Sequence, residues 1–125
     1  FVMALSQRWP AAEHSYRQWH AARDSASWPP MALGQVVFVP VDDRTCVANM
    51  VAQRGIGRSH LGTPPIRYDA LEDCLTQVAS WARDWDHASV HMPRIGCGLA
   101  GGRWEMVGPI VERTLVGLDS YVYDI

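Results

Sequence analysis

The residue pattern with the clearest chemical use is a cluster of four glycines: Gly96, Gly98, Gly101 and Gly102. Residues 88–92 form a short apolar run that predicts a buried strand, and helical spacing begins at Arg103. Glycine accepts positive φ and has no Cβ that would keep a ligand away from the backbone. Successive N–H groups of such a loop, with the N-terminus of the following helix, can bind an anion. The pattern predicts a loop for a phosphate or diphosphate; the alternative is a tight turn between strand and helix.

The same glycines satisfy the spacing of a dinucleotide-binding fingerprint, Gly96-x-Gly98-x-x-Gly101. A Rossmann domain carries this turn in its first strand-helix unit and continues with several more strands and helices. Only a short stretch follows Gly101 in this sequence. We therefore do not expect a dinucleotide-dependent dehydrogenase.

Few other groups could carry chemistry. Cys97 lies inside the glycine cluster, but no histidine has a reason in the sequence to lie beside it as a base. Asp42 and Asp43 lie between two apolar runs, where short acidic side chains form turns, and we interpret them as turn residues. All eleven basic residues are arginines, which excludes any mechanism that needs a lysine of this chain.

The composition indicates one small domain without a basic surface. The 125 residues suffice for a packed core, and the net charge of -2 argues against nucleic acid as the main partner. Apolar runs are too short to cross a membrane and no signal-peptide pattern opens the chain, so we expect a cytoplasmic protein. Cys46, Cys74 and Cys97 show neither metal-ligand spacing nor a disulfide framework. We expect no metal and no other cofactor.

Hydrophobic periodicity predicts the elements that position the glycines. Helices are expected at residues 1–9, 11–24, 67–85 and 104–115, and strands at residues 35–40, 46–53, 88–92 and 121–125. The first two strands are expected to form a hairpin. Pro109 predicts a kink or a late start in the last helix, because proline lacks the N–H that a helix interior uses. The alternation from Cys46 onward predicts a three-layer α/β/α fold with a mixed central sheet.

With these motifs placed, the chain resembles the macro domain family, an α/β fold that binds ADP-ribose. It is most similar to the branch of the terminal ADP-ribose protein glycohydrolases and the ADP-ribose-1''-phosphate phosphatase-like proteins. The matching stretches cover nearly the whole chain: Val47-Ala48-Asn49-Met50 with Gln53, Pro64 to Leu71, Met92 to Leu99 with Trp104-Glu105, and Tyr121 to Ile125.

The resemblance implies which residues contact a ligand. In that family the loop matching residues 94–100 surrounds the diphosphate and the distal ribose, and the end of the last strand lies near the adenosine. ADP-ribose or an ADP-ribosylated group is therefore the expected partner. The implied binding residues are Arg94, Ile95, Gly96, Cys97, Gly98, Leu99, Ala100 and Ile125.

Two departures limit what the resemblance implies. The glycohydrolases use a lysine near the position of Gln53 and an aspartate at the position of Ala100, so their chemistry is not carried over. Arg54 does not replace the lysine, because its guanidinium stays protonated. Family members also open with two strands and a first glycine-bearing loop, and Phe1 matches a position after that loop. Residues 1–125 are thus expected to be a single macro domain that is N-terminally incomplete.

Three functions are consistent with the sequence. The first is a module that binds ADP-ribose without turnover. The second is a hydrolase of an ADP-ribose derivative, such as the 1''-phosphate or an ester. Its general base would be one of four nearby candidates: His60, His91, Asp69 and Glu105. The third is an interaction domain that has lost nucleotide binding, for which the six tryptophans offer a partner surface.

Overall fold

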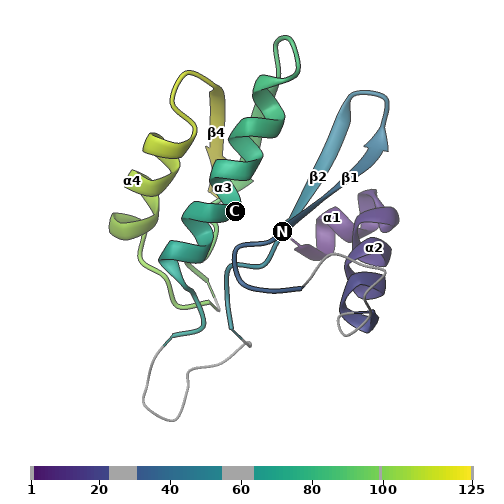
Figure 1. The fold of residues 1–125 in the computed structure, drawn as a ribbon, viewed down its shortest axis with the longest axis horizontal. Coiled ribbons are helices and arrows are strands. Elements are labelled where there is room, and N and C mark those ends of the chain that lie inside the picture. The colour runs from purple at the N-terminus through teal and green to yellow at the C-terminus, as the bar shows by residue number, and fades with distance from the viewer. Residues whose placement is uncertain (1, 23–30, 55–63, 99, 125) are drawn as a thin grey trace.

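A computed structural model describes residues 2–22, 31–54, 64–98 and 100–124. Helices and strands alternate along most of these ranges, which confirms the predicted α/β class (Figure 1). The elements are, in chain order, α1 (Val2–Arg8), α2 (Pro10–Ala21), β1 (Val36–Asp42), β2 (Thr45–Met50), α3 (Tyr68–Arg83), β3 (Ser89–Pro93), α4 (Trp104–Thr114) and β4 (Asp119–Tyr123).

The helices form where apolar residues recur on one face. In α3 the expected stripe of Leu71, Leu75, Val78 and Ala82 is buried. Residues of this stripe pack against α4, and the two helices enclose the main hydrophobic core together with β3. Burial of this stripe, and not helix propensity alone, stabilises the helix.

Pro109 lies inside α4, which starts at Trp104 and continues to Thr114. The expectation of a late helix start is therefore wrong. The apolar face explains why the helix tolerates the proline, because Val107, Val111 and Leu115 are all buried in the core on successive turns. Their packing offsets the one backbone hydrogen bond that proline cannot donate.

The first two strands form the predicted hairpin. β1 pairs antiparallel with β2, and Asp42 accepts a hydrogen bond from the N–H of Arg44 at 2.8 Å in the turn. This backbone hydrogen bond lowers the pKa of Asp42 and confirms the aspartate as a turn residue. On one side of the hairpin, Asn49 donates to the carbonyl of Ala12 in α2 at 3.0 Å. α3 lies on the other side of the hairpin (Figure 1).

β3 and β4 form a parallel pair joined by α4, with Pro93 opposite Tyr123. This crossover confirms one of the two expected parallel units. Across the described part of the chain, however, β2 and β3 are not paired, so the strands form two separate two-stranded sheets and not one continuous mixed sheet. A helix between two strands, such as α3 between β2 and β3, permits parallel pairing but does not make the strands neighbours. No helix among the described residues is long and apolar enough to span a bilayer.

Candidate functional site

The glycine loop, residues 94–102, begins where β3 ends at its carboxyl end and leads into α4. Hydrogen bonds within the loop close its backbone on itself. The N–H of Gly102 donates to the carbonyl of Gly96 at 2.6 Å, and the N–H of Gly101 donates to the carbonyl of Gly98 at 3.0 Å. The loop is therefore a compact turn at the edge of the sheet where α/β folds bind ligands.

Three of the four glycines are required by the loop's own geometry. Gly96 and Gly101 have φ of 75° and 76°, which side chains rarely adopt. At Gly102 a Cβ would collide with the carbonyl oxygen of Gly96. Gly98 differs, because its φ is not in the left-handed region and a Cβ there would have no described residue within 4 Å. The fold alone does not explain the glycine at this position.

Several N–H groups of the loop have no partner among the described residues. Among the described residues, no hydrogen-bond acceptor is found for the N–H groups of Gly96, Gly98 and Ala100. A backbone that presents several free donors within one tight turn is a typical anion site. The predicted phosphate chemistry thus has donors in the right part of the chain.

Ile66 packs against the glycine loop. Its N–H donates to the carbonyl of Ala100 at 3.0 Å, and its side chain would be 2.9 Å from a Cβ at Gly96. Ile66 also forms an isolated antiparallel bridge with Gln53, beyond the end of β2. The side chain of Ala100 is buried in the core. Of the predicted binding residues, Ala100 can therefore offer a ligand its backbone only.

Arg94 connects the loop to the end of β4. Its Nε lies 2.7 Å from Oδ1 of Asp124, and its Cζ lies 5.5 Å from the ring centroid of Trp104, the first residue of α4. The parallel register of β3 and β4 brings the two charged residues together, because Pro93 lies opposite Tyr123. Asp124 was not among the predicted site residues. The signal for it was its position next to the implied ligand residue Ile125.

Cys97 is half-buried in the loop, and its Sγ lies 3.5 Å from the carbonyl oxygen of Ile95. Burial raises the pKa of the Cys97 thiol, although the nearby Arg94 opposes this shift. The thiol is therefore protonated at neutral pH. A protonated thiol without an adjacent base is a poor nucleophile, in agreement with the sequence, which offers no base beside Cys97.

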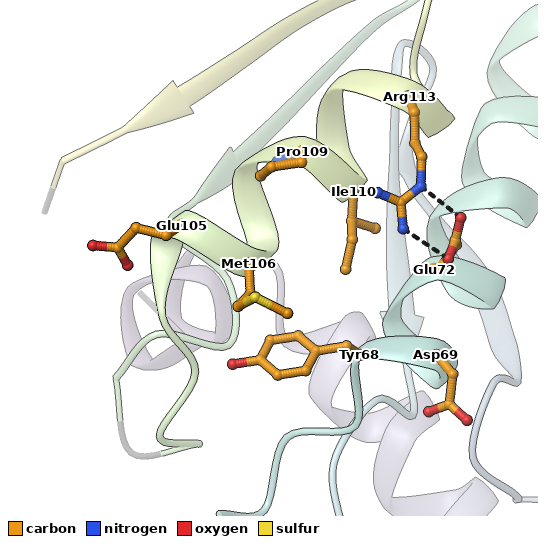
Figure 2. Close-up of a pocket in the computed structure, with 8 residues that line it drawn as sticks. All are labelled: Tyr68, Asp69, Glu72, Glu105, Met106, Pro109, Ile110 and Arg113. Carbon is orange, nitrogen blue, oxygen red and sulfur yellow. Dashed lines mark hydrogen bonds and ion pairs between the residues drawn. The ribbon is translucent and has the colours of Figure 1, made fainter.

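A cavity of about 310 Å³ lies between the N-terminal part of α3 and one side of α4, from Glu105 to Arg113. Asp69 and Glu105, two of the candidate bases, line it from opposite helices (Figure 2). Tyr68 connects the cavity to the loop, since its hydroxyl accepts a hydrogen bond from the N–H of Arg103 at 3.2 Å. The structure thus places two candidate acids in one cavity, and Tyr68 of this cavity contacts the residue that follows the loop.

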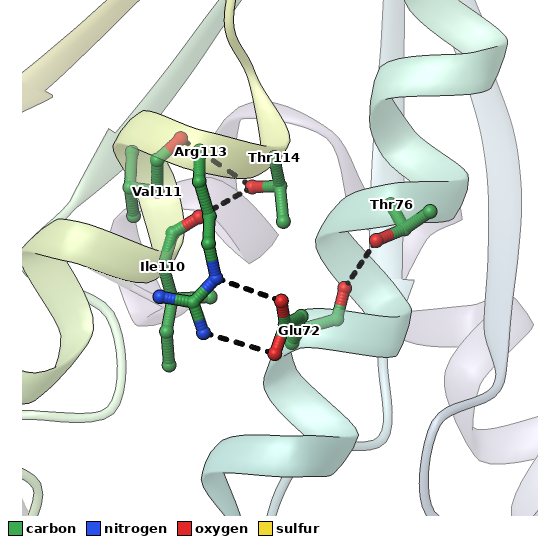
Figure 3. Close-up of polar contacts among 6 residues, drawn as sticks. All are labelled: Glu72, Thr76, Ile110, Val111, Arg113 and Thr114. Atoms are coloured by element: carbon green, nitrogen blue, oxygen red, sulfur yellow. Dashed lines mark hydrogen bonds and ion pairs between the residues drawn. The ribbon is translucent and has the colours of Figure 1, made fainter.

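The far wall of this cavity is an ion pair between the two helices. Arg113 donates to both carboxylate oxygens of Glu72, at 2.8 and 2.9 Å (Figure 3). These hydrogen bonds lower the pKa of Glu72 and raise that of Arg113. Glu72 is therefore a structural carboxylate and not a candidate base. Glu105 points away from this pair and is mostly exposed (Figure 2).

His91 is not positioned as a free base. Its Nε2 lies 2.8 Å from the hydroxyl of Ser89, and its Nδ1 lies 2.8 Å from the hydroxyl of Tyr123. The imidazole also stacks against the rings of Tyr121 and Tyr123, at centroid distances of 4.9 and 5.8 Å. Both ring nitrogens are therefore engaged within the β3 and β4 sheet.

Three predicted residues lie outside the described part of the chain: His60, Leu99 and Ile125. Where the chain is described, no group of three or more His, Cys, Asp or Glu side chains could hold a metal ion. The site therefore consists, as far as it is described, of the loop backbone, the Arg94 side chain and the neighbouring acids.

No protein-family model matches the chain, and no curated protein matches it. Several solved structures are similar over its whole length. One is a protein of unknown function from Bacteroides thetaiotaomicron, 46% identical with a TM-score of 0.91, of which the chain covers 77%. A second from the same organism is 45% identical with a TM-score of 0.90, of which the chain covers 78%.

A third similar structure is that of a macrodomain protein from Streptomyces coelicolor. It is 42% identical, and the alignment covers 100% of this chain and 77% of that protein, with a TM-score of 0.82. The similarity in sequence and in backbone extends over the whole chain, the glycine loop and its flanking elements included.

Proposed function

Because the chain belongs to the macrodomain family, we propose that it binds ADP-ribose or an ADP-ribosylated group through the glycine loop. The observation that carries this proposal is the set of loop N–H groups without an acceptor among the described residues, at Gly96, Gly98 and Ala100. A diphosphate is the group of ADP-ribose that such donors would bind.

A second observation, the lack of a side chain at Gly98, supports the same proposal. The loop conformation requires its other glycines, whereas a Cβ at Gly98 would point into open space. A ligand that approaches the backbone closely at this position explains why a side chain is absent. In the proposed complex Ile95 and Cys97 complete the loop, and Leu99 and Ile125 contact the ligand as the resemblance implies.

The test is isothermal titration calorimetry of the chain with ADP-ribose, with ADP and AMP as controls. Micromolar or tighter binding that is selective for ADP-ribose is expected. Gly98→Val should weaken it at least about tenfold, because branched methyl groups would occupy the space of the diphosphate. Gly98→Ala is the graded control, and thermal melting confirms that both variants fold. Absence of heat from a folded protein, or unchanged affinity in Gly98→Val, would contradict the proposal.

Hydrolysis of an ADP-ribose derivative is the second candidate function. It is favoured by one observation: Asp69 and Glu105 line a cavity that is connected to the loop through Tyr68. The positions of the family's lysine and aspartate hold Gln53 and the buried Ala100, so water would have to be the nucleophile. Release of phosphate from ADP-ribose-1''-phosphate, lost in Glu105→Gln or Asp69→Asn, would establish it. Turnover that survives both changes would exclude these two residues.

Two points from the sequence remain, the location of the protein and the third candidate function. We propose a cytoplasmic location, because the three widely spaced cysteines show no disulfide framework. The third function, an interaction domain without nucleotide binding, makes the opposite prediction for the titration with ADP-ribose. The same calorimetric experiment therefore separates it from the binding module.

A further inference from the structure

Arg94 is the first residue of the glycine loop, and two residues contact its guanidinium. Asp124 binds its Nε at 2.7 Å, and the ring of Trp104 lies under its Cζ at 5.5 Å. A carboxylate and an aromatic face together restrict both the direction and the plane of a guanidinium. The Arg94 side chain is nevertheless 53% exposed, so it remains accessible to a ligand.

Trp104 is itself held by the helix that it begins. A Cβ at Gly108 would lie 3.3 Å from Nε1 of Trp104, so the indole rests against the backbone of the next turn of α4. The indole is also partly buried against the hydrophobic core. The surface on which Arg94 rests is therefore rigid, whereas Asp124 is 79% exposed and can be changed without loss of packing.

The position of Asp124 beside Nε determines which N–H donors of Arg94 remain for a ligand. A guanidinium has five N–H donors, one of them on Nε and four on the two terminal nitrogens. The ion pair uses the Nε side, and Asp124 is the only ion-pair partner of Arg94 within the described ranges. The terminal nitrogens are the pair of donors that bind two oxygens of a phosphate in parallel.

We propose that Asp124 and Trp104 are positioning residues that orient Arg94 so that its terminal nitrogens bind a phosphate of ADP-ribose at the glycine loop. This inference rests on the proposed function and names the side chain that would recognise the charge. The ion pair itself contributes little to stability, because it is isolated and exposed. The loop N–H groups and the Arg94 guanidinium would then bind the same diphosphate from different sides.

The test compares Asp124→Ala with Asp124→Asn in calorimetric titrations with ADP-ribose. The alanine removes the group that holds Nε, and the affinity should fall about tenfold. Asparagine keeps an oxygen at the position that faces Nε, so its affinity should stay within about twofold of the unchanged chain or become tighter. Glu13→Gln is the matched control, because it removes one negative charge from a different exposed arginine–carboxylate pair, Arg17–Glu13 on α2, and should leave the affinity unchanged.

Two readouts separate positioning from a general effect. In an Arg94→Gln background, Asp124→Ala should have no further effect on affinity. In NMR spectra, the Nε–H signal of Arg94, assigned by its absence in Arg94→Gln, should be retained in Asp124→Asn and lost or shifted in Asp124→Ala. If Asp124→Ala still weakens ADP-ribose binding in the Arg94→Gln background, Asp124 does not act through Arg94, and the inference is contradicted.

The outcomes distinguish this inference from the function on which it rests. If the unchanged chain does not bind ADP-ribose, the proposed function fails, and the inference fails with it. If the unchanged chain binds and Asp124→Ala binds equally well, only the inference is overturned. Tighter binding by Asp124→Ala would also overturn it, since the carboxylate would then compete with the phosphate for Arg94.

Discussion

The backbone N–H of Gly102 lies 2.6 Å from the carbonyl oxygen of Gly96, and this hydrogen bond closes the glycine loop. The contact is so close that a Cβ on Gly102 would collide with the same oxygen. Gly98 lies between these two residues and has open space where its Cβ would be. The loop therefore combines glycines that keep its shape with one glycine that leaves room beside it.

The first prediction concerns the closing hydrogen bond. Gly102→Ala should destabilise the protein by about 1 to 3 kcal/mol, because the loop must open to admit the Cβ. This corresponds to a fall in Tm of roughly 3 to 15 °C for a domain of this size. Gly98→Ala is the control and should change stability by less than about 0.5 kcal/mol. Equal melting temperatures of the two variants would show that the closure is not rigid.

The second prediction concerns the core between α3 and α4. Leu75 is 2% exposed and belongs to the main hydrophobic cluster. Leu75→Ala should cost about 2 to 5 kcal/mol, because it removes apolar contacts and leaves a cavity. Val116→Ala, at a residue that is 67% exposed, should cost less than about 0.5 kcal/mol. Urea unfolding monitored by circular dichroism measures both, and a cost below 1 kcal/mol at Leu75 would contradict the described packing.

The third prediction is a loss of stability at alkaline pH caused by Cys74. Its side chain is fully buried, and its Sγ lies 3.6 Å from the carbonyl oxygens of Gln35 and Val51. Burial raises the pKa of Cys74 from its ordinary value of 9.0 to about 11. Between these values the unfolded chain binds fewer protons than the folded chain, so the free energy of unfolding falls as the pH rises. Below pH 9 this residue contributes no pH dependence.

The size of this effect follows from the two pKa values and reaches at most about 2 to 3 kcal/mol. Urea unfolding at several pH values between 8 and 11 measures it. Cys74→Ala should be less stable at neutral pH because of the cavity, but its stability should fall less steeply above pH 9. Parallel curves for the two proteins would mean that Cys74 ionises freely in the folded state.

The fourth prediction concerns the contact between the hairpin and α3. Phe38 of β1 stacks on Trp81 of α3, with ring centroids 4.5 Å apart and an interplanar angle of 7°. Phe38→Leu keeps an apolar side chain but loses the stack, and should cost about 0.5 to 1.5 kcal/mol. Trp85→Leu, at a residue that is 61% exposed and whose ring only meets Trp81 in a tilted contact at 6.2 Å, is the comparison and should cost less. A larger effect at Trp85, measured by thermal melting, would contradict this view of the contact.

Most of the local structure could be predicted from the sequence. The stripe of α3 from Leu71 to Ala82 and the buried face of α4 depend on spacing within a single helix, so the pattern is sufficient to find them. The same holds for the turn at Asp42 and for the loop glycines, whose chemistry acts on their own backbone. The late start expected at Pro109 was wrong, because core packing of the helix outweighs one missing hydrogen bond.

The arrangement of the strands could not be predicted in the same way. The sequence favours one mixed sheet, whereas the described strands form an antiparallel pair and a parallel pair. Alternating strands and helices determine the direction of successive strands. Which strands become neighbours depends on the packing of all layers, and that information lies in no single segment.

The sequence by itself determined the α/β class, the identity of the helices and a glycine loop suited to a diphosphate, because each depends on residues close together in the chain. Only the tertiary structure showed that Asp124 holds Arg94. The parallel register of β3 and β4, with Pro93 opposite Tyr123, brings these charges together across thirty positions of the chain. That register is a relation between two strands far apart in the sequence, so the pattern of neither strand alone determines it.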